Sequence, residues 1–249
     1  MQPKKTNQQI NDMRTAGKIL AEIFVELRKK VKPGVNELEI DKWVEQEILK
    51  RGAVVTYKTP EIDFPGSICI SVNDAIVHGA PKDYNFERGD VAKFDLDVTY
   101  NDMTVDAAFT MIVGEEPTGT KKHLLTTTER AMWAGIDVAG PVHTGDVSAE
   151  VEKVLKKAGL GIVRELVGHG VGNKPHMEPE VPNYGNKGTG KKLNVGDTIS
   201  IEPMAMLGGD SIKLDDDGWT YKTKDGTLAA HFEHTVLITE DGCEVLTQL

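Results

Sequence analysis

The chain has 249 residues, of which 39% are hydrophobic and 27% are charged, and this balance excludes disordered and fibrous proteins. A net charge of −10 argues against a nucleic-acid site or a membrane surface, because both require clustered Lys and Arg. Two cysteines are too few for a disulfide framework, which fits a reducing compartment.

The N-terminal part of the chain predicts two helices. Lys4 and Lys5 make its start basic, but no apolar stretch follows them, so we expect no signal peptide and a cytoplasmic location. Apolar residues at steps of three and four predict an amphipathic helix over residues 7–30. Asn36 offers an N-cap for a second helix that ends near Arg51.

Strands dominate the rest of the chain, with one further pair of helices. The segment 67–72 predicts a short buried strand, and residues 91–99 and 105–113 predict the two strands of a hairpin. Helices are predicted over 119–138 and 146–158, and strands and loops follow from Gly161. We therefore expect one α+β domain over residues 1–249, with no membrane-spanning segment.

An internal repeat connects the two helical regions. Residues 35–52 and 142–159 align without a gap at a constant offset of 107, and several apolar positions and the final glycine match. Two amphipathic helices could resemble each other by chance. The alternative is two related halves, at roughly 7–113 and 119–249, with a site between them that draws side chains from both.

The predicted hairpin carries the first candidate metal ligands. If its turn centres between Tyr100 and Asn101, Asp95 lies opposite Asp106. Two facing carboxylates on a buried strand face destabilise the sheet unless a cation lies between them. Asp97 shares the face of Asp95 and leaves the register open, and one Asp could instead face solvent.

Further candidates follow in segments rich in Gly, Pro or apolar residues. His169 lies between two glycines, with His176 seven residues later. Glu202 follows an apolar strand and Glu233 lies within another, where a lone acidic residue is unusual. An edge position or a salt bridge would also explain each glutamate.

Taken together, four carboxylates and one imidazole would offset most of the charge of two divalent cations. Oxygen-rich ligands favour Mn, Fe(II) or Co(II), with zinc also compatible. Paired metals suit hydrolysis, because they generate a bridging hydroxide at neutral pH. The combined set therefore predicts a dinuclear hydrolase.

The order of these motifs resembles the type I methionine aminopeptidases, which have the two-halved pita-bread fold. Asp95 and Asp106 are eleven positions apart, and GHG, IEPM and FEHT follow. The segment CISVNDAIVHGAP (69–81) and the short spacing from Glu202 to Glu233 are similar to the type I branch. The resemblance covers residue 7 to the C-terminus.

This resemblance implies a fold, an activity and a set of roles. It implies helices packed on a curved, mostly antiparallel sheet, and a monomer that removes the initiator methionine of nascent polypeptides before a small second residue. The ribosome is a further candidate partner. The two metals would be bound by Asp95, Asp106, His169, Glu202 and Glu233.

The resemblance also implies roles beyond metal binding. Glu202 would shuttle a proton, His176 would stabilise the tetrahedral intermediate, and His78 would contact the substrate. The methionine pocket would be lined by Phe64, Cys69 and Trp219, with Met204 nearby.

The sequence departs from the type I pattern at three places. Pro175 replaces a common bulky apolar residue, segment 56–64 differs, and His231 stands where type I members often have glutamine. His231 could add a metal ligand or a hydrogen bond. His123 and His143 match nothing catalytic and are expected at the surface.

Two other functions remain open at this point. Xaa-Pro peptidases share the fold but usually carry a further N-terminal domain, for which 249 residues leave no room, and HGAP favours the methionine branch. A non-catalytic binding protein of the same fold usually loses metal ligands, whereas all five positions are filled here.

Overall fold

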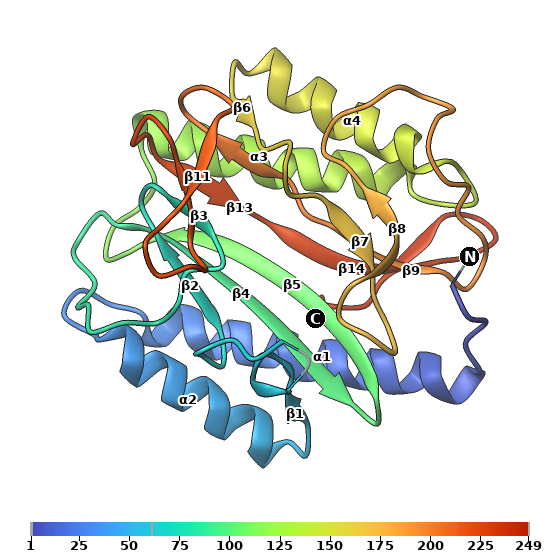
Figure 1. Cartoon of the computed structure of the whole chain (residues 1–249), viewed down its shortest axis with the longest axis horizontal. Helices are drawn as coiled ribbons and strands as arrows, with labels where there is room; N and C mark the ends of the chain where they lie inside the picture. Colours follow the sequence, from blue (N-terminus) through green and yellow to red (C-terminus); the bar gives the residue numbers. More distant parts are fainter. Residues whose placement is uncertain (1, 61, 249) are drawn as a thin grey trace.

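The computed structural model describes residues 2–60 and 62–248, and it contains two pairs of helices around a large sheet (Figure 1). The helices are α1 (Asn7–Lys30), α2 (Glu37–Lys50), α3 (Gly119–Val138) and α4 (Thr144–Lys157), with a 3₁₀ turn η1 (Thr56–Lys58). Asn36 caps α2 by accepting a hydrogen bond from the Leu38 amide, as predicted. No helix within these residues is long and apolar enough to cross a bilayer.

The strands are short except for one central hairpin. The first five are β1 (Val54–Val55), β2 (Cys69–Val72), β3 (Ala75–Val77), β4 (Val91–Tyr100) and β5 (Met103–Ile112). The next five are β6 (Gly161–Ile162), β7 (Gly168–Gly170), β8 (Met177–Val181), β9 (Thr198–Ile201) and β10 (Met204–Met206). The last five are β11 (Ile212–Leu214), β12 (Tyr221–Thr223), β13 (Ala229–His231), β14 (Glu233–Ile238) and β15 (Cys243–Val245).

Nine of the described strands form one sheet. Its order is β1-β4-β5-β14-β9-β7-β8, with β2 paired to β4 and β15 paired to β14. Every pairing within it is antiparallel. The predicted α+β class with a mostly antiparallel sheet is therefore confirmed.

The helices bury their apolar faces against the long strands of this sheet. Helix α1 packs against β4 and β5, whereas α3 packs against α4 and contacts β9, β13 and β14 (Figure 1). Leu20 and Leu27 of α1 are fully buried, as expected for the apolar face of an amphipathic helix. Residues 91–98 of β4 are all buried, so this strand is covered on both faces.

The hairpin register differs from the prediction. Asp106 lies opposite Asp97, and Asp95 lies opposite Ala108, because the turn centres between Asn101 and Asp102. Both turn residues have positive φ, 47° and 61°, which is the geometry of a two-residue hairpin turn. The predicted pairing of Asp95 with Asp106 was therefore wrong: the turn lies one position later than predicted, and the partner of each aspartate is shifted by two residues.

Contacts repeat along the chain at the offset of 107 found in the sequence. The isolated bridge between Asn36 and Asn85 has its counterpart between His143 and Lys192. Three hydrogen bonds of the first half also recur in the second. The bond from Glu37 N to Tyr84 O corresponds to that from Thr144 N to Lys191 O, and the bond from Phe86 N to Val35 O corresponds to that from Leu193 N to Val142 O. The bond from Glu87 N to the Asp90 carboxylate corresponds to that from Asn194 N to the Asp197 carboxylate. The division into two halves stays a prediction, and these matched contacts support it.

Candidate metal centre

The five predicted metal ligands all line one cavity of about 250 Å³. Each of the five residues is at most 9% exposed: Asp95, Asp106, His169, Glu202 and Glu233. The predicted catalytic residues His78 and His176 line the same cavity, together with Met204. The volume lies below the roughly 300–1,000 Å³ of sites for drug-sized ligands and suits the end of a peptide.

Sheet order brings the five side chains together. Asp95 is on β4, Asp106 on β5, Glu233 on β14, Glu202 directly after β9, and His169 on β7. These five strands are consecutive neighbours in the sheet. Residues far apart in the sequence therefore converge because each strand contributes one side chain.

The glycines beside His169 are required by close backbone contacts. A Cβ atom at Gly168 would lie 2.4 Å from the Ser200 carbonyl oxygen, and one at Gly170 would lie 2.3 Å from that of Glu178. Neither backbone oxygen can move without disturbing the sheet. The GHG motif thus lets β7 fit tightly between β8 and β9 and fixes the position of His169.

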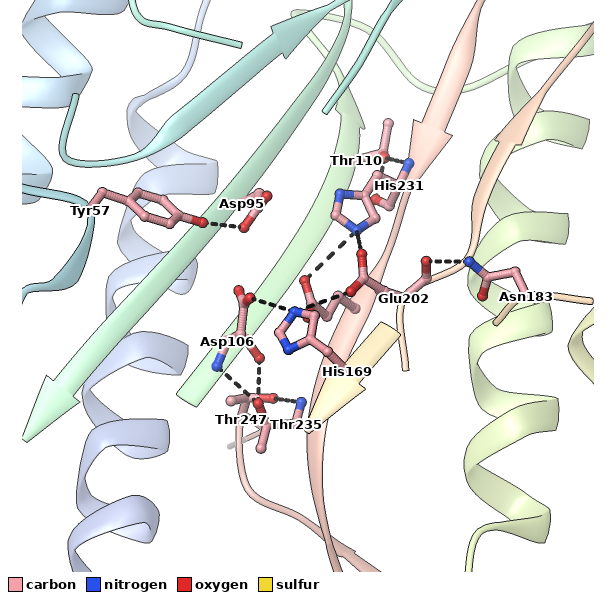
Figure 2. A network of polar contacts seen from close by, with 11 residues as sticks. Tyr57, Asp95, Asp106, Thr110, His169, Asn183, Glu202, His231, Thr235 and Thr247 are labelled. Carbon is pink, nitrogen blue, oxygen red and sulfur yellow. Dashed lines mark hydrogen bonds and ion pairs between the residues drawn. The ribbon is translucent and has the colours of Figure 1, made fainter. Parts of the chain in front are cut away.

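His169 is oriented as a metal ligand would be. Its Nδ1 lies 3.1 Å from the Gly170 carbonyl oxygen, which can only accept, so Nδ1 carries the proton. Its Nε2 faces Asp106 Oδ2 at 3.8 Å and Glu202 Oε1 at 3.4 Å (Figure 2). Burial is the main reason that the pKa of His169 falls to about 3, so the ring is neutral and its Nε2 lone pair is free to bind a cation.

The carboxylates of this site carry charge that the protein itself does not compensate. Burial, followed by repulsion from Asp106, raises the pKa of Asp95, Glu202 and Glu233 well above their ordinary values. Asp106 Oδ1 and Glu233 Oε1 are buried without a hydrogen-bond partner. Such atoms are costly unless a cation binds them, so the residues present fit divalent metal ions.

Two groups of three side chains could each hold a metal ion. Asp106, His169 and Glu233 form one group, and Glu202, His231 and Glu233 form the other. Within each group the ligand atoms lie within 4.8 Å of one another. Whether the five predicted residues bind the metals stays a prediction, but the structure brings all five together.

Asp97 is a buried acidic residue whose role the sequence left open. It is 1% exposed, lies opposite Asp106 in the ladder, and neither carboxylate oxygen has a hydrogen-bond partner. Burial and the charges of Asp106 and Asp95 raise its pKa well above the ordinary value. It adds a further uncompensated carboxylate beside the predicted ligands.

The two predicted catalytic histidines differ in exposure and in the rings they contact. The His176 ring is exposed and lies 4.3 Å from the His169 ring, centroid to centroid. His78 has a positive φ of 56° and its ring packs against Tyr221. Burial, helped by His176, lowers the pKa of His78 to about 4, so it is neutral at neutral pH.

The three predicted pocket residues form a separate apolar cluster. Phe64 and Cys69 are buried there with Tyr57, and Trp219 packs its ring against Phe64 at 5.3 Å. Tyr57 connects this cluster to the cavity, because its hydroxyl donates a 2.7 Å hydrogen bond to Asp95 Oδ1. The sequence analysis missed Tyr57, since a tyrosine in an irregular segment carries no periodic signal.

Comparison with known proteins gives consistent results over the whole chain. Residues 11–240 match the model of metallopeptidase family M24. A methionine aminopeptidase of Clostridium perfringens is 42% identical, with 98% of this chain and 97% of the relative covered. Methionine aminopeptidase 1 of Bacillus subtilis is 38% identical, with 98% of each covered.

Solved structures show the same similarity in three dimensions. The crystal structure of methionine aminopeptidase from Thermotoga maritima matches with a TM-score of 0.96 and 37% identity over 100% of both chains. A prolidase from Pyrococcus furiosus matches with a TM-score of 0.78 and 24% identity, covering 99% of this chain and 65% of the prolidase. The prolidase match supports the fold alone.

Proposed function

Because this chain belongs to metallopeptidase family M24 and has its pita-bread fold, we propose that it is a type I methionine aminopeptidase. It would remove the N-terminal methionine of polypeptides and prefer a small second residue. The observation that carries this proposal is the convergence of the five buried residues predicted to bind metal, from five adjacent strands, on one cavity.

Five side chains would hold two divalent cations, with Asp106 and Glu233 shared between them. When bound, such a pair activates water at neutral pH and stabilises the charge of the tetrahedral transition state. We propose Co(II), Mn(II) or Fe(II) as the metals, since carboxylate oxygens dominate the ligand set. The neutral His169, held by the Gly170 carbonyl, would supply the nitrogen donor.

Three residues of the chain would handle the proton and the substrate. Glu202 has a raised pKa, which suits a carboxylate that takes a proton from water and passes it to the leaving amine. His176, exposed at the cavity, would donate a hydrogen bond to the oxygen that gains charge. The neutral His78 would bind the substrate backbone.

The apolar cluster of Phe64, Cys69 and Trp219 would receive the methionine side chain. Tyr57 joins that cluster to Asp95, so a thioether placed there would bring the first peptide bond toward the ligands. The partner would be the N-terminus of a nascent polypeptide in the cytoplasm, presented at the ribosome. An Xaa-Pro peptidase is not favoured, because that similarity extends to the fold alone.

The proposal is tested by methionine release from a Met-Ala-Ser peptide. Chelator-treated protein should be inactive, and added Co(II), Mn(II) or Fe(II) should restore release. Asp106→Ala should reduce restored activity more than about 100-fold, because it removes a shared ligand. Asp137→Ala is the matched control, since Asp137 is exposed on α3 and should retain full activity.

No release with any of the three metals, from protein shown to be folded by circular dichroism, would contradict the proposal. Release by Asp106→Ala at the rate of the control would contradict the assignment of the site. Comparison with an Ala-Pro peptide then separates the methionine activity from an Xaa-Pro activity.

A further inference from the structure

His231 is a further imidazole beside the carboxylates of this site, outside the five predicted ligands. It ends β13, and its side chain is 1% exposed. Thr110 holds its backbone, donating to the His231 carbonyl oxygen at 2.6 Å and accepting from its amide at 3.0 Å. Neither ring nitrogen of His231 has a hydrogen-bond partner, which is rare for a buried polar side chain.

The distances around His231 are those of a ligand shell and not of hydrogen bonds. Its Nε2 lies 3.7 Å from Glu202 Oε2 and 3.7 Å from Glu233 Oε2, both too long for a hydrogen bond. Two donor atoms that are each about 2.1 Å from one cation lie roughly 3.0–4.2 Å apart. The predicted ligand His169 has comparable separations of 3.8 and 3.4 Å from its carboxylate neighbours.

The Glu202 carboxylate lies between the two imidazole rings (Figure 2). Its Oε1 faces His169 and its Oε2 faces His231. Imidazole binds divalent cations through an unprotonated ring nitrogen, and no hydrogen bond occupies either ring nitrogen of His231.

We propose that His231 is a metal ligand, which binds a divalent cation together with Glu202 and Glu233. This inference rests on the proposed metal centre and adds a second nitrogen donor to it. Imidazole favours Co(II), Ni(II) and Zn(II) over Mn(II), which prefers oxygen. His231 would therefore shift the metal preference of this chain toward nitrogen-seeking ions.

The number of bound imidazoles can be counted directly. Proton NMR of the chelator-treated full chain reloaded with Co(II) resolves the shifted N–H signal of each coordinated histidine. We expect two such signals in the wild-type protein and one, from His169, in His231→Gln. His123→Gln, the same change at an exposed site on α3, should keep both.

Metal affinity gives a second readout. His231→Gln should weaken Co(II) binding by at least about tenfold in titration calorimetry and weaken Mn(II) binding less. Glutamine is common at this position in the type I branch, so the variant is expected to fold. One shifted signal in the wild-type protein, or two in His231→Gln, would overturn the inference without reference to affinity.

Methionine release by the same preparations separates this inference from the proposed function. Two shifted histidine signals without any methionine release would contradict the proposed function but support His231 as a metal ligand. Methionine release by wild-type protein with only one shifted signal would support the proposed function and contradict the assignment of His231 as a ligand.

Discussion

At the residue scale, the identity of the acidic and imidazole side chains was predictable, but their partners were not. Asp95, Asp106, Glu202 and Glu233 stand out because a buried strand rarely carries an unpaired acid. The sequence cannot show which carboxylates share a cation, since that depends on distances between strands.

Asp97 gives a test of the uncompensated charge at this scale. Its raised pKa means that Asp97 is still protonated in the folded protein at pH values where the unfolded chain, above about pH 4, has lost this proton. The free energy of unfolding therefore falls as the pH rises from about 4 toward the folded pKa of Asp97. Asp97→Asn should therefore stabilise the metal-free protein by about 1–3 kcal/mol at pH 8, and less at pH 5.

The measurement is the thermal unfolding midpoint in chelator at pH 5 and pH 8. The buried histidines are the same in both proteins, so their opposite contribution to the pH dependence cancels in the difference. Asp137→Asn, an exposed change on α3, should show no pH-dependent gain. A stabilisation by Asp97→Asn that does not grow with pH would contradict the burial of a charged Asp97.

At the element scale, the helices and the long strands were predictable because their patterns are long. Helix α1 spans residues 7–30 and α3 spans 119–138, as predicted. The hairpin register was not predictable, because the sequence YNDM allows the turn to centre at either of two positions. The positive φ of Asn101 and Asp102 decides it, and that property is set by the backbone.

Asp102 therefore carries a conformational cost that glycine would remove. A non-glycine residue in the left-handed region is less stable by about 1–2 kcal/mol. We expect Asp102→Gly to raise the unfolding midpoint by about 2–4 °C per kcal/mol gained, measured by calorimetry. Asp241→Gly, in a turn outside the positive-φ residues, should give no gain. An equal effect of both changes would contradict the turn assignment.

At the scale of the whole molecule, the repeat was visible in the sequence of one helical segment from each half, but not in the spacing of the predicted metal ligands. Asp95 and Glu202 are separated by the same 107 residues as the matched contacts of the two halves. The other predicted ligands follow no constant offset, because the second half has additional short strands between β9 and β14. Sequence comparison alone could therefore not show that the halves contribute equivalent ligands.

In the large sheet the two halves meet at a short seam between β5 and β14, and in a smaller sheet β3 of the first half pairs with β12 of the second. Only two residue pairs join β5 and β14 in the described ladder, Glu233 with Ala108 and His234 with Ala107. Thr235 reinforces the seam, because its hydroxyl donates to the Asp106 carbonyl oxygen at 2.8 Å and accepts from the Asp106 amide. We propose that the halves, roughly 7–113 and 119–249, are complementary units.

Splitting the chain tests this proposal. Fragments 1–115 and 116–249, separated in an exposed connection, should restore methionine release when co-expressed and show none when expressed singly. Each fragment lacks part of the ligand set, since Asp95 and Asp106 are on the first and the other three are on the second. Release by either fragment alone, or failure of the co-purified pair to bind Co(II), would contradict the proposal.

The seam also bears on ancestry. If the two halves arose by duplication, a single copy held too few ligands for a pair of cations and bound them only by joining a second copy. Cation binding would then have stabilised a dimer of two single copies before any gene fusion, and fusion would have made the dimer a single chain. On this hypothesis, which successful complementation by the separate fragments would support, the lineage began as a dimer held together by its own cofactor.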